Sequence, residues 1–249
     1  MFDLSGTVAL VTGSGQHVGA GIARALAERG AVVAVNDLVS ERAEATVAAI
    51  RGAGGTAAAV AFDVTDLEAV KAGVASVAAD LGPVDILVNN AGNAGAHRMR
   101  PTPFRDMDPA DWSAPIDVNL YGVLNCSHAV IGAMCDREWG RVITIASGAG
   151  TVGLKLGVST YAAGKGGSIA FMRHLAIENA RFGVTANTLA IGLMQAPTED
   201  GTAALAKQIP VGRVGRPEDI AALCVYLASR EASWMTGQTI ELNGGSVTT

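Results

Sequence analysis

Short apolar runs alternate along the whole chain with segments whose apolar positions recur every three or four residues. Runs of four to six residues are typical of buried strands, and the longer spacing is typical of one face of a helix. The runs occupy residues 7–12, 31–36, 57–62, 84–88, 141–146, 184–189 and 239–242. Seven strands that alternate with helices predict an α/β fold with a doubly wound parallel sheet and helices on both faces.

The helices between these strands have less certain ends than the strands. They are expected at residues 22–29, 40–51, 67–81 and 109–137, in a segment from Tyr161 to about 182, and at 217–229. No repeat, linker or low-complexity tract interrupts the alternation, so residues 1–249 are predicted to form a single domain.

Polar residues or glycine stand where five of the predicted strands end, at Asp37, Asp63, Asn90, Ser147 and Gly192. Ligands of a doubly wound parallel sheet bind beyond the carboxyl ends of its strands. The five positions therefore predict one binding crevice along that edge of the sheet.

A glycine-rich stretch, 13–21, follows the first strand and leads into a helix, a second strand and Asp37. This order of elements places a pyrophosphate at a helix N-terminus and a carboxylate at a ribose. A glycine run alone would also fit a simple turn. Together with its flanking elements, it predicts a dinucleotide-binding site.

Tyr161 and Lys165 are four residues apart, which puts both side chains on one face of a helix. A phenol has an ordinary pKa near 10, and a neighbouring ammonium favours its ionised form. The pair is therefore a candidate proton relay. The spacing alone also fits an ordinary amphipathic surface helix.

Composition narrows the possible partners. The chain is 49% hydrophobic and 16% charged with a net charge of −5, so no basic field indicates binding to nucleic acid or an anionic membrane. No apolar run reaches the ~18 residues of a membrane span, and no signal peptide begins the chain. The three cysteines have no metal-ligand spacing and are expected to be free buried thiols in a reducing compartment. These features predict a soluble cytoplasmic protein without a metal site.

The motifs and their order resemble the short-chain dehydrogenase/reductase family along the whole chain, and within it the 3-oxoacyl-carrier-protein reductase-like branch. The resemblance implies a Rossmann fold and oxidoreductase activity on a small alcohol or carbonyl substrate. It rests on Thr12-Gly13 with Gly19, Asp63-Val64, residues 89–92, Asn119, Ser147, residues 161–165, 212–221, 235–238 and 243–245.

The resemblance also implies catalytic roles. Tyr161 would exchange a proton with the carbinol oxygen, and Lys165 would lower its pKa and hold the nicotinamide ribose. Ser147 would hydrogen-bond the substrate oxygen, unless it only caps a strand end. Asn119 would hold a water that links Lys165 to solvent, unless it is merely a polar residue inside a helix.

The same resemblance implies that a nicotinamide dinucleotide lies along the predicted crevice. The residues expected to bind it are Gly13, Gln16, His17, Val18, Gly19, Asp37, Leu38, Asp63, Val64, Asn90, Ala91, Gly92, Tyr161, Lys165, Gly192 and Met194.

The glycine loop departs from the family pattern of glycines at its first, fifth and seventh positions. Counting from Gly13 puts His17 at the fifth position, whereas counting from Gly15 fits all three. The distance to the helix-ending Gly30 favours the Gly13 register, so His17 replaces a glycine. Its side chain is expected to point outward while its backbone skirts the phosphate.

Two further departures lie near the substrate. The loop between Ser147 and Tyr161 is one residue longer than usual, within 154–160. Ile191 replaces a proline, and Ala196 stands where a threonine commonly helps to hold the carboxamide, a role that Thr198 could take.

Asp37 predicts which nicotinamide cofactor is used. A carboxylate at the end of the second strand accepts hydrogen bonds from ribose hydroxyls and repels a 2′-phosphate. Arg42, the nearest guanidinium, lies a turn into the next helix. NAD(H) is therefore predicted in preference to NADP(H), although Asp37 could instead only cap that helix.

The substrate is the least defined part of the prediction. Residues 93–99, 149–156 and 193–209 are expected to line its pocket, with 193–209 as a lid. They are mostly small and apolar, which suits a modest uncharged carbonyl or an acyl chain. The basic stretch 97–100 with Arg105 could grip a phosphate-bearing carrier such as coenzyme A, or could be a solvated loop.

Three functions stay open on these grounds: a secondary-alcohol dehydrogenase or ketone reductase, a reductase of 3-oxoacyl thioesters on acyl carrier protein or coenzyme A, and a dinucleotide-sensing or scaffold protein. The resemblance further implies a homotetramer that pairs two apolar helices. Their apolar residues are Val123, Leu124, Val130, Ile131, Ile169 and Phe171.

Overall fold

Seven parallel strands form one sheet in the computed structural model, which describes residues 1–93, 99–195 and 202–248. The strand order is β3-β2-β1-β4-β5-β6-β7, so the chain winds outward from β1 in one direction and from β4 in the other. This confirms the predicted doubly wound sheet and Rossmann fold. The strands are β1 Val8–Val11, β2 Val32–Asp37, β3 Thr56–Ala61, β4 Ile86–Asn89, β5 Gly140–Ser147, β6 Val184–Ile191 and β7 Thr239–Leu242.

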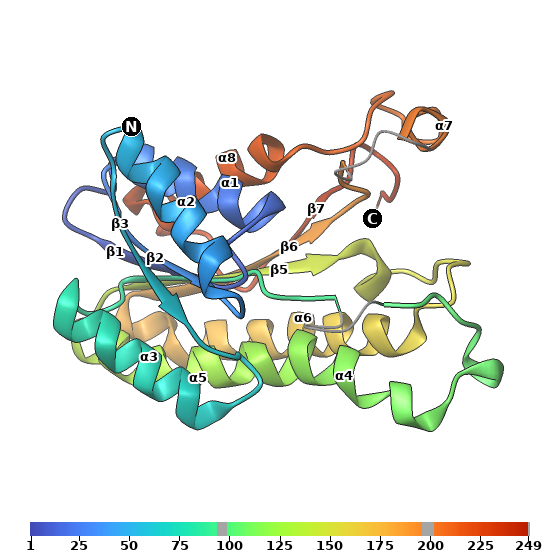
Figure 1. Ribbon diagram of the computed structural model, residues 1–249, viewed down its shortest axis with the longest axis horizontal. Coiled ribbons are helices and arrows are strands. Elements are labelled where there is room, and N and C mark those ends of the chain that lie inside the picture. Colours follow the sequence, from blue (N-terminus) through green and yellow to red (C-terminus); the bar gives the residue numbers. More distant parts are fainter. Residues whose placement is uncertain (94–98, 196–201, 249) are drawn as a thin grey trace.

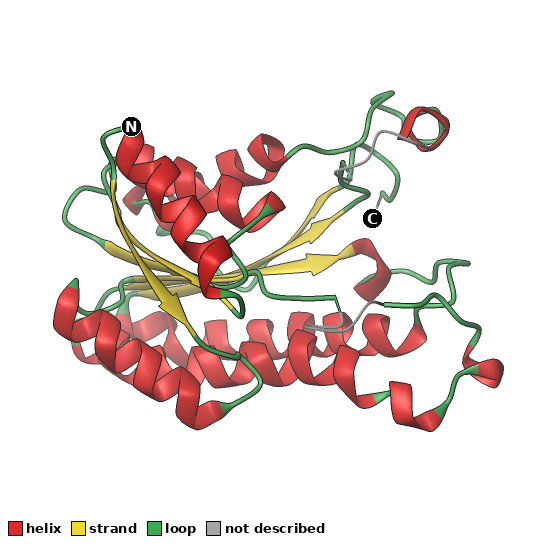
Figure 2. Ribbon diagram, viewed as in Figure 1, coloured by secondary structure: helices red, strands yellow, loops and turns green. Residues whose placement is uncertain are grey.

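Helices cover both faces of the sheet (Figures 1 and 2). One layer holds α1 (His17–Glu28), α2 (Ser40–Gly52) and α8 (Pro217–Ala228). The opposite layer holds α3 (Leu67–Asp80), α5 (Gly122–Asp136) and α6 (Ser159–Asn179), with the short α4 (Ser113–Ile116) before α5. The short α7 (Thr202–Ala206) lies away from both layers, beyond the carboxyl ends of the strands.

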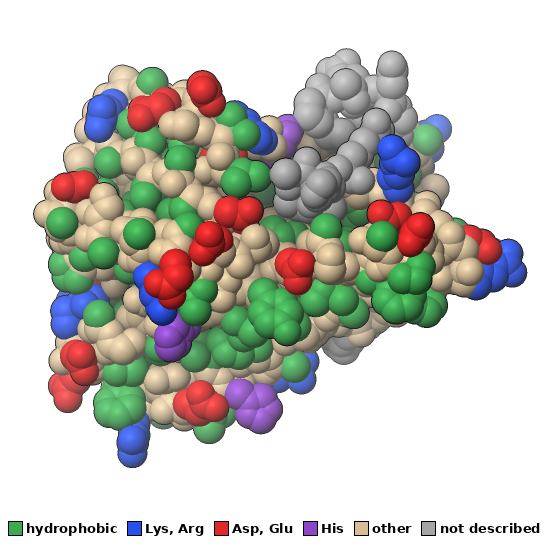
Figure 3. Space-filling model, turned by 60° about the horizontal axis from the view of Figure 1, so that its bottom comes forward, with side chains coloured by type: hydrophobic (Ala, Val, Ile, Leu, Met, Phe, Trp, Pro, Cys, Tyr) green, Lys and Arg blue, Asp and Glu red, His purple; other side chains and the backbone are tan. Residues whose placement is uncertain are grey.

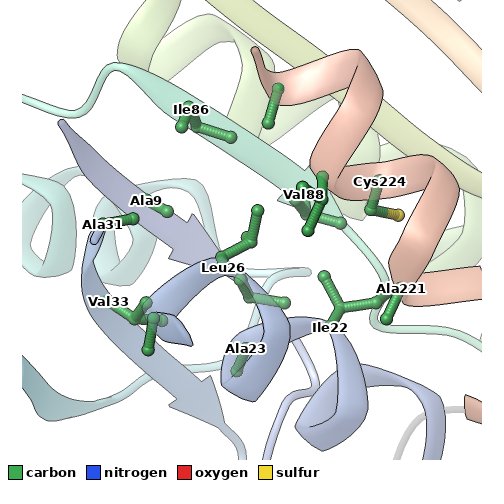
Figure 4. Close-up of a cluster of buried hydrophobic side chains, with 14 of the residues drawn as sticks. Ala9, Ile22, Ala23, Leu26, Ala31, Val33, Ile86, Val88, Ala221 and Cys224 are labelled. Atoms are coloured by element: carbon green, nitrogen blue, oxygen red, sulfur yellow. The ribbon is translucent and has the colours of Figure 1, made fainter. Parts of the chain in front are cut away.

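Each layer has its own apolar core against the sheet. On the α1 side, Ile22 and Leu26 pack with Cys224 of α8 over β4, as Figure 4 shows. These side chains are fully or almost fully buried because α1 and α8 lie close together on the central strands. The second core, under α3, α5 and α6, includes Cys126 and Met134.

The long helix expected at 109–137 is interrupted. Pro109–Asp111 forms a 3₁₀ turn, α4 follows, and Asp117–Tyr121 forms a π-helical turn before α5 begins. A π-helical turn accommodates one extra residue, and such turns are frequent at functional sites. Here the turn carries Asn119.

The stretch Pro109–Asp136 is also the one described helical segment that is long and apolar enough to cross a membrane by length and composition. Asp117, Asn125 and His128 interrupt the stretch, and a core helix of a soluble protein has the same length and composition, so the expected absence of a membrane span stays a prediction. The helix packs against β4 and β5 and neighbours α3 and α6, and 44% of its apolar window is buried in the fold.

The loop before α6 is fastened to the segment that precedes α4. The Thr102 amide donates a 2.8 Å hydrogen bond to the Gly157 carbonyl. Thr160, the neighbour of Tyr161, contacts the Met107 sulfur at 3.8 Å. The extra residue expected in this loop is therefore accommodated in a stretch that packs against another segment of the chain.

Candidate active site

The glycine loop forms a tight cradle between β1 and α1. Gly13 has a φ of +59°, and a β-carbon there would lie 2.8 Å from the Cα of Ala91. A β-carbon on Gly19 would lie 2.5 Å from Asn90 Nδ2, which donates hydrogen bonds to the carbonyls of Thr12 and Gly13 at 2.9 Å. Both glycines are therefore required by close approach. Gly15 and Gly21 are as tightly packed, against Asp37 with Arg42 and against Pro217, so the choice of the register that starts at Gly13 stays a prediction.

His17 begins α1 with a φ of +47°, in the left-handed region that favours glycine. This conformation agrees with the prediction that His17 occupies a position where relatives carry glycine. Its side chain is exposed, and the residue lines the cavity described below. How its backbone approaches a phosphate stays a prediction.

The Asp37 carboxylate accepts hydrogen bonds from the glycine loop and from the segment that begins α2. One oxygen accepts a hydrogen bond from the Gly15 amide at 3.1 Å, and the other accepts one from the Val39 amide at 3.0 Å. Arg42 Nε lies 3.5 Å from the carboxylate. Asp37 thus supports the start of α2, as the alternative interpretation held, and it also lines the cavity.

One cavity of about 780 Å³ runs along the carboxyl ends of the strands. Every residue predicted to bind a cofactor lines it, together with Ser147. Asn119 does not line it, and neither does any residue of 149–156, which were expected around the substrate. Lining residues that the sequence did not indicate include Phe62, Ser113, Ala114, Asp117 and Pro217. They come from loops and helix starts, which have no sequence motif.

Tyr161 and Lys165 both lie on α6 and face the cavity, so their predicted helical spacing is confirmed. Lys165 is 5% exposed, and its Nζ donates a 2.6 Å hydrogen bond to the carbonyl of Ile145 in β5. The same Nζ lies 5.9 Å from the centre of the Tyr161 ring. Burial lowers the pKa of Lys165 to about 8.

Burial raises the pKa of the Tyr161 phenol, and the neighbouring Ser147 side chain acts in the opposite direction. The lowering of this pKa by Lys165, which the resemblance implied, is therefore not found in the protein alone. The physical reason is that loss of hydration disfavours phenolate, and the same burial weakens the positive charge on Lys165.

Ser147 ends β5, and its hydroxyl accepts a 3.2 Å hydrogen bond from the Ala149 amide. It therefore caps the 3₁₀ turn Gly148–Gly150, as the structural alternative proposed. Because a hydroxyl can accept one hydrogen bond and donate another, this cap still leaves its proton free for a ligand oxygen in the cavity.

Asn119 is completely buried in the π-helical turn. Its Nδ2 donates to the carbonyls of Asn93 and Pro115, whereas its Oδ1 accepts no hydrogen bond from the described residues. A β-carbon on Gly92 would lie 3.0 Å from this oxygen and 3.1 Å from Lys165 Nζ. Both polar atoms thus face the space that the glycine leaves open.

Several predicted positions lie outside the described residues: His97 and Arg98 of the basic stretch, and Ala196 and Thr198 of the expected lid. Among the residues that the structure does describe, no group of His, Cys, Asp or Glu could hold a metal ion. The cysteines are free, as expected, but Cys135 is only partly buried, which corrects the expectation of three buried thiols. Burial raises the pKa of Cys126 to about 12.

The fold and this cavity are those of a nucleotide-dependent oxidoreductase, and a family model described as enoyl-(acyl carrier protein) reductase matches residues 13–247. The chain belongs to the short-chain dehydrogenase/reductase family. An acetoacetyl-CoA reductase from Shinella zoogloeoides is 39% identical over 96% of this chain and 97% of its own. A 3-oxoacyl-[acyl-carrier-protein] reductase from Vibrio harveyi is 38% identical over 98% of both chains.

Among solved structures, a gluconate 5-dehydrogenase from Burkholderia cenocepacia, in complex with NADP and tartrate, superimposes with a TM-score of 0.90. It is 34% identical, and the match covers 98% of this chain and 96% of that one. The relatives therefore confirm an oxidoreductase whose family includes acyl thioester reductases and a sugar-acid dehydrogenase.

Proposed function

We propose that this protein transfers hydride between NAD(H) and a secondary alcohol or ketone, with Tyr161 as the acid-base. The observation that carries the proposal is the convergence of Tyr161, Ser147 and buried Lys165 at one end of a cavity whose other end is the glycine cradle. Side chains at Gly13 and Gly19 would collide with Ala91, Ser14 and Asn90, so the two glycines let the loop fold closely enough to line the cavity. The cofactor, when bound, supplies the hydride.

The protein's own residues donate and accept the proton of the reaction. The raised pKa of the Tyr161 phenol keeps it protonated at neutral pH, so the phenol can donate to a carbonyl oxygen that gains negative charge. Ser147 supplies a second donor for the same oxygen. Lys165 and Oδ1 of Asn119, which has no partner among the described residues, are the groups that would pass a proton from solvent back to Tyr161.

A preference for NAD(H) over NADP(H) is supported by Asp37, whose carboxylate lines the adenosine half of the cavity. Arg42 is paired with that carboxylate, so its charge is partly offset. The relative crystallised with NADP makes direct measurement essential. In fluorescence titrations with both reduced cofactors, NADH should bind more tightly, and Asp37→Ala should narrow the difference. Tighter binding of NADPH to the unmodified protein would refute the preference.

Substrate class separates the leading function from its alternatives. The reductases among the relatives favour 3-oxoacyl thioesters as the second candidate. Consumption of NADH should be measured over simple ketones, cyclic ketones and 3-oxoacyl thioesters of coenzyme A and acyl carrier protein. Fast turnover of thioesters alone would support the second candidate. Tight NADH binding without any turnover would support a dinucleotide sensor or scaffold.

We propose three further features. Residues 193–209 would act as the substrate lid, because Leu193 and Met194 already line the cavity. A cytoplasmic location is supported by free cysteines. A homotetramer is supported by the exposed apolar side chains of Ile177 on α6 and Tyr121 on the π-helical turn.

A further inference from the structure

Two amide side chains line the cavity and take no part in the proton transfer described above. They belong to Asn93, which follows β4, and Gln195, which follows β6, and both residues are exposed. The hydrogen bonds that the described residues make with Asn93 and Gln195 go through their backbones. Because β4, β5 and β6 are neighbours in the sheet, the two amides flank Ser147 at the end of β5 from either side.

Asn93 is held at the end of the cavity that carries Tyr161 and Lys165. Its φ of +65° lies in the left-handed region, which asparagine adopts more readily than most residues. Its carbonyl accepts a 2.5 Å hydrogen bond from Asn119 Nδ2. The residue before it, Gly92, is so close to Lys165 that a β-carbon there would lie 3.1 Å from Nζ. These contacts fix the position of Asn93 next to the buried lysine.

Gln195 is held on the opposite side of the same end. In the sheet register Ser147 pairs with Ile191, so the chain that leaves β6 passes directly beside Ser147. It is then fastened to Gly215, whose carbonyl accepts a 2.8 Å hydrogen bond from the Gln195 amide. The Gly215 amide in turn donates a 2.9 Å hydrogen bond to the Leu193 carbonyl. The backbone of Gln195 is therefore fixed as firmly as that of Asn93.

We propose that the substrate is a ketone with a hydroxyl group on the carbon next to its carbonyl, or the vicinal diol that this ketone gives on reduction. An amide offers both donors and an acceptor, which matches a hydroxyl that also donates and accepts. Tyr161 and Ser147 hold the carbonyl oxygen, and Asn93 or Gln195 binds the neighbouring hydroxyl. This inference rests on the proposed function and names its substrate class.

The reaction is that of the proposed function. The carbonyl carbon gains hydride from NADH and its oxygen gains the proton of Tyr161, so the products are the diol and NAD⁺. The hydroxyl on the neighbouring carbon is unchanged and serves only for binding.

The same end of the cavity favours an uncharged substrate. Among the described lining residues the only arginine is Arg42, which is paired with Asp37 at the adenosine end. Lys165 is buried, and its ammonium is bound to the Ile145 carbonyl. Leu193 lines the cavity as well and gives the carbon skeleton an apolar contact. Hydroxyl groups on a short carbon chain fit this combination better than a carboxylate or a phosphate.

The test compares ketones that differ by one hydroxyl group: 3-hydroxy-2-butanone with 2-butanone, and 2-hydroxycyclohexanone with cyclohexanone. With NADH, the unmodified protein should have a kcat/KM about tenfold higher for the hydroxy ketone of each pair. Gln195→Leu and Asn93→Gly should lower this ratio about three- to tenfold, because each removes one amide. Leucine is close to glutamine in size, and glycine adopts the left-handed backbone of Asn93 without strain.

A hydroxyl group also makes the carbonyl beside it more reactive, and this chemical difference is the same in every variant. The change of the ratio between variants therefore measures the contact with the amide. Gln208→Leu is the matched control, because Gln208 is exposed and does not line the cavity. It should keep the full ratio.

The outcomes separate this inference from the proposed function. A lower ratio in one variant alone would assign the hydroxyl to that amide. A ratio that is unchanged in both variants, or faster turnover of 3-oxoacyl thioesters than of any hydroxy ketone, would overturn the substrate class and leave hydride transfer intact. Failure to reduce any ketone or thioester despite NADH binding would overturn the proposed function, and this inference with it.

Discussion

Burial acts on the two central ionisable side chains in ways that make each less charged. The pKa of Tyr161 is raised and that of Lys165 is lowered to about 8. Near neutral pH the protein therefore presents a phenol that can donate a proton and a lysine that is close to losing one. This state suits reduction of a carbonyl, whereas oxidation of an alcohol first requires phenolate.

The first prediction concerns the pH dependence of oxidation. Because the pKa of Tyr161 lies above its ordinary value near 10, the phenolate fraction should grow about tenfold per pH unit below that value. The kcat/KM for alcohol oxidation should therefore rise steadily between pH 7 and 9. Tyr161→Phe should lower the rate about 10²- to 10⁴-fold with little change in NADH affinity. Wild-type activity in that variant would exclude Tyr161 as the acid-base.

A second prediction follows from the cost of burying Lys165. Its folded pKa of about 8 lies below the reference value of 10.5, so the unfolded chain binds more protons between these values and stability rises with pH there. Lys165→Met should raise the free energy of unfolding at pH 7 by about 1–3 kcal/mol, after loss of the bond to Ile145. Activity should be lost.

Urea unfolding at pH 7 and pH 10 measures this effect in the absence of cofactor. The gain should shrink at the higher pH, because Lys165 is then neutral in the folded protein. Lys155→Met, at an exposed loop position, is the control and should change stability little at either pH. An equal gain at both pH values would contradict the electrostatic origin.

At the scale of the elements, the strands were predicted to within two residues at each end, because parallel strands buried on both faces are short and almost wholly apolar. The region around Asn119 could not be predicted in the same way. Its apolar periodicity is that of one long helix, whereas in the structure Asn119 of the π-helical turn donates hydrogen bonds to the carbonyls of Asn93 and Pro115. Such contacts leave no trace in periodicity.

Part of the candidate site could be predicted from the sequence and part could not. Residues at strand ends and in the glycine loop could be predicted because topology fixes where they lie. The protonation state of Tyr161 could not be predicted, because it depends on how deeply the phenol is buried. The pairing of Arg42 with Asp37 was not found either, because it depends on a side-chain conformation.

The third prediction tests the packing of α1 against the glycine loop. A β-carbon on Gly19 would lie closest to the Gly13 carbonyl oxygen, then 2.5 Å from Asn90 Nδ2 and 2.8 Å from Ser14 Cα, so Gly19→Ala must displace all three. Thermal or urea unfolding should show a loss of about 1–3 kcal/mol, with weaker NADH binding. Gly52→Ala is the control, because nothing lies within 4 Å of its added carbon. Equal stability of both variants would show that the loop adjusts freely.

At the scale of the whole molecule, the helix layer of α3, α5 and α6 combines burial with exposed apolar groups (Figure 3). Of the helix residues expected to pair subunits, Val123, Val130 and Ile169 are buried within the chain itself. Ile177 of α6 and Tyr121 are 77% and 54% exposed. These two side chains are therefore better candidates for contact with a second copy.

The fourth prediction is the mass in solution. Four copies of a 25.2 kDa chain correspond to about 100 kDa, and light scattering coupled to gel filtration should give that value. Ile177→Glu should shift the protein to smaller species, because a carboxylate would have to be buried in the contact. A single 25.2 kDa species for the unmodified protein would exclude the tetramer.

The cavity is assembled from two parts of the chain that barely mix in sequence. Its adenosine half comes mainly from residues before 93, and its proton-transfer half from residues after 112. If the first part alone sets the preference for NAD(H) or NADP(H), coenzyme choice can change without a change in substrate. A chimera that takes only the first part from an NADP-binding relative should then exchange its coenzyme and keep its substrate.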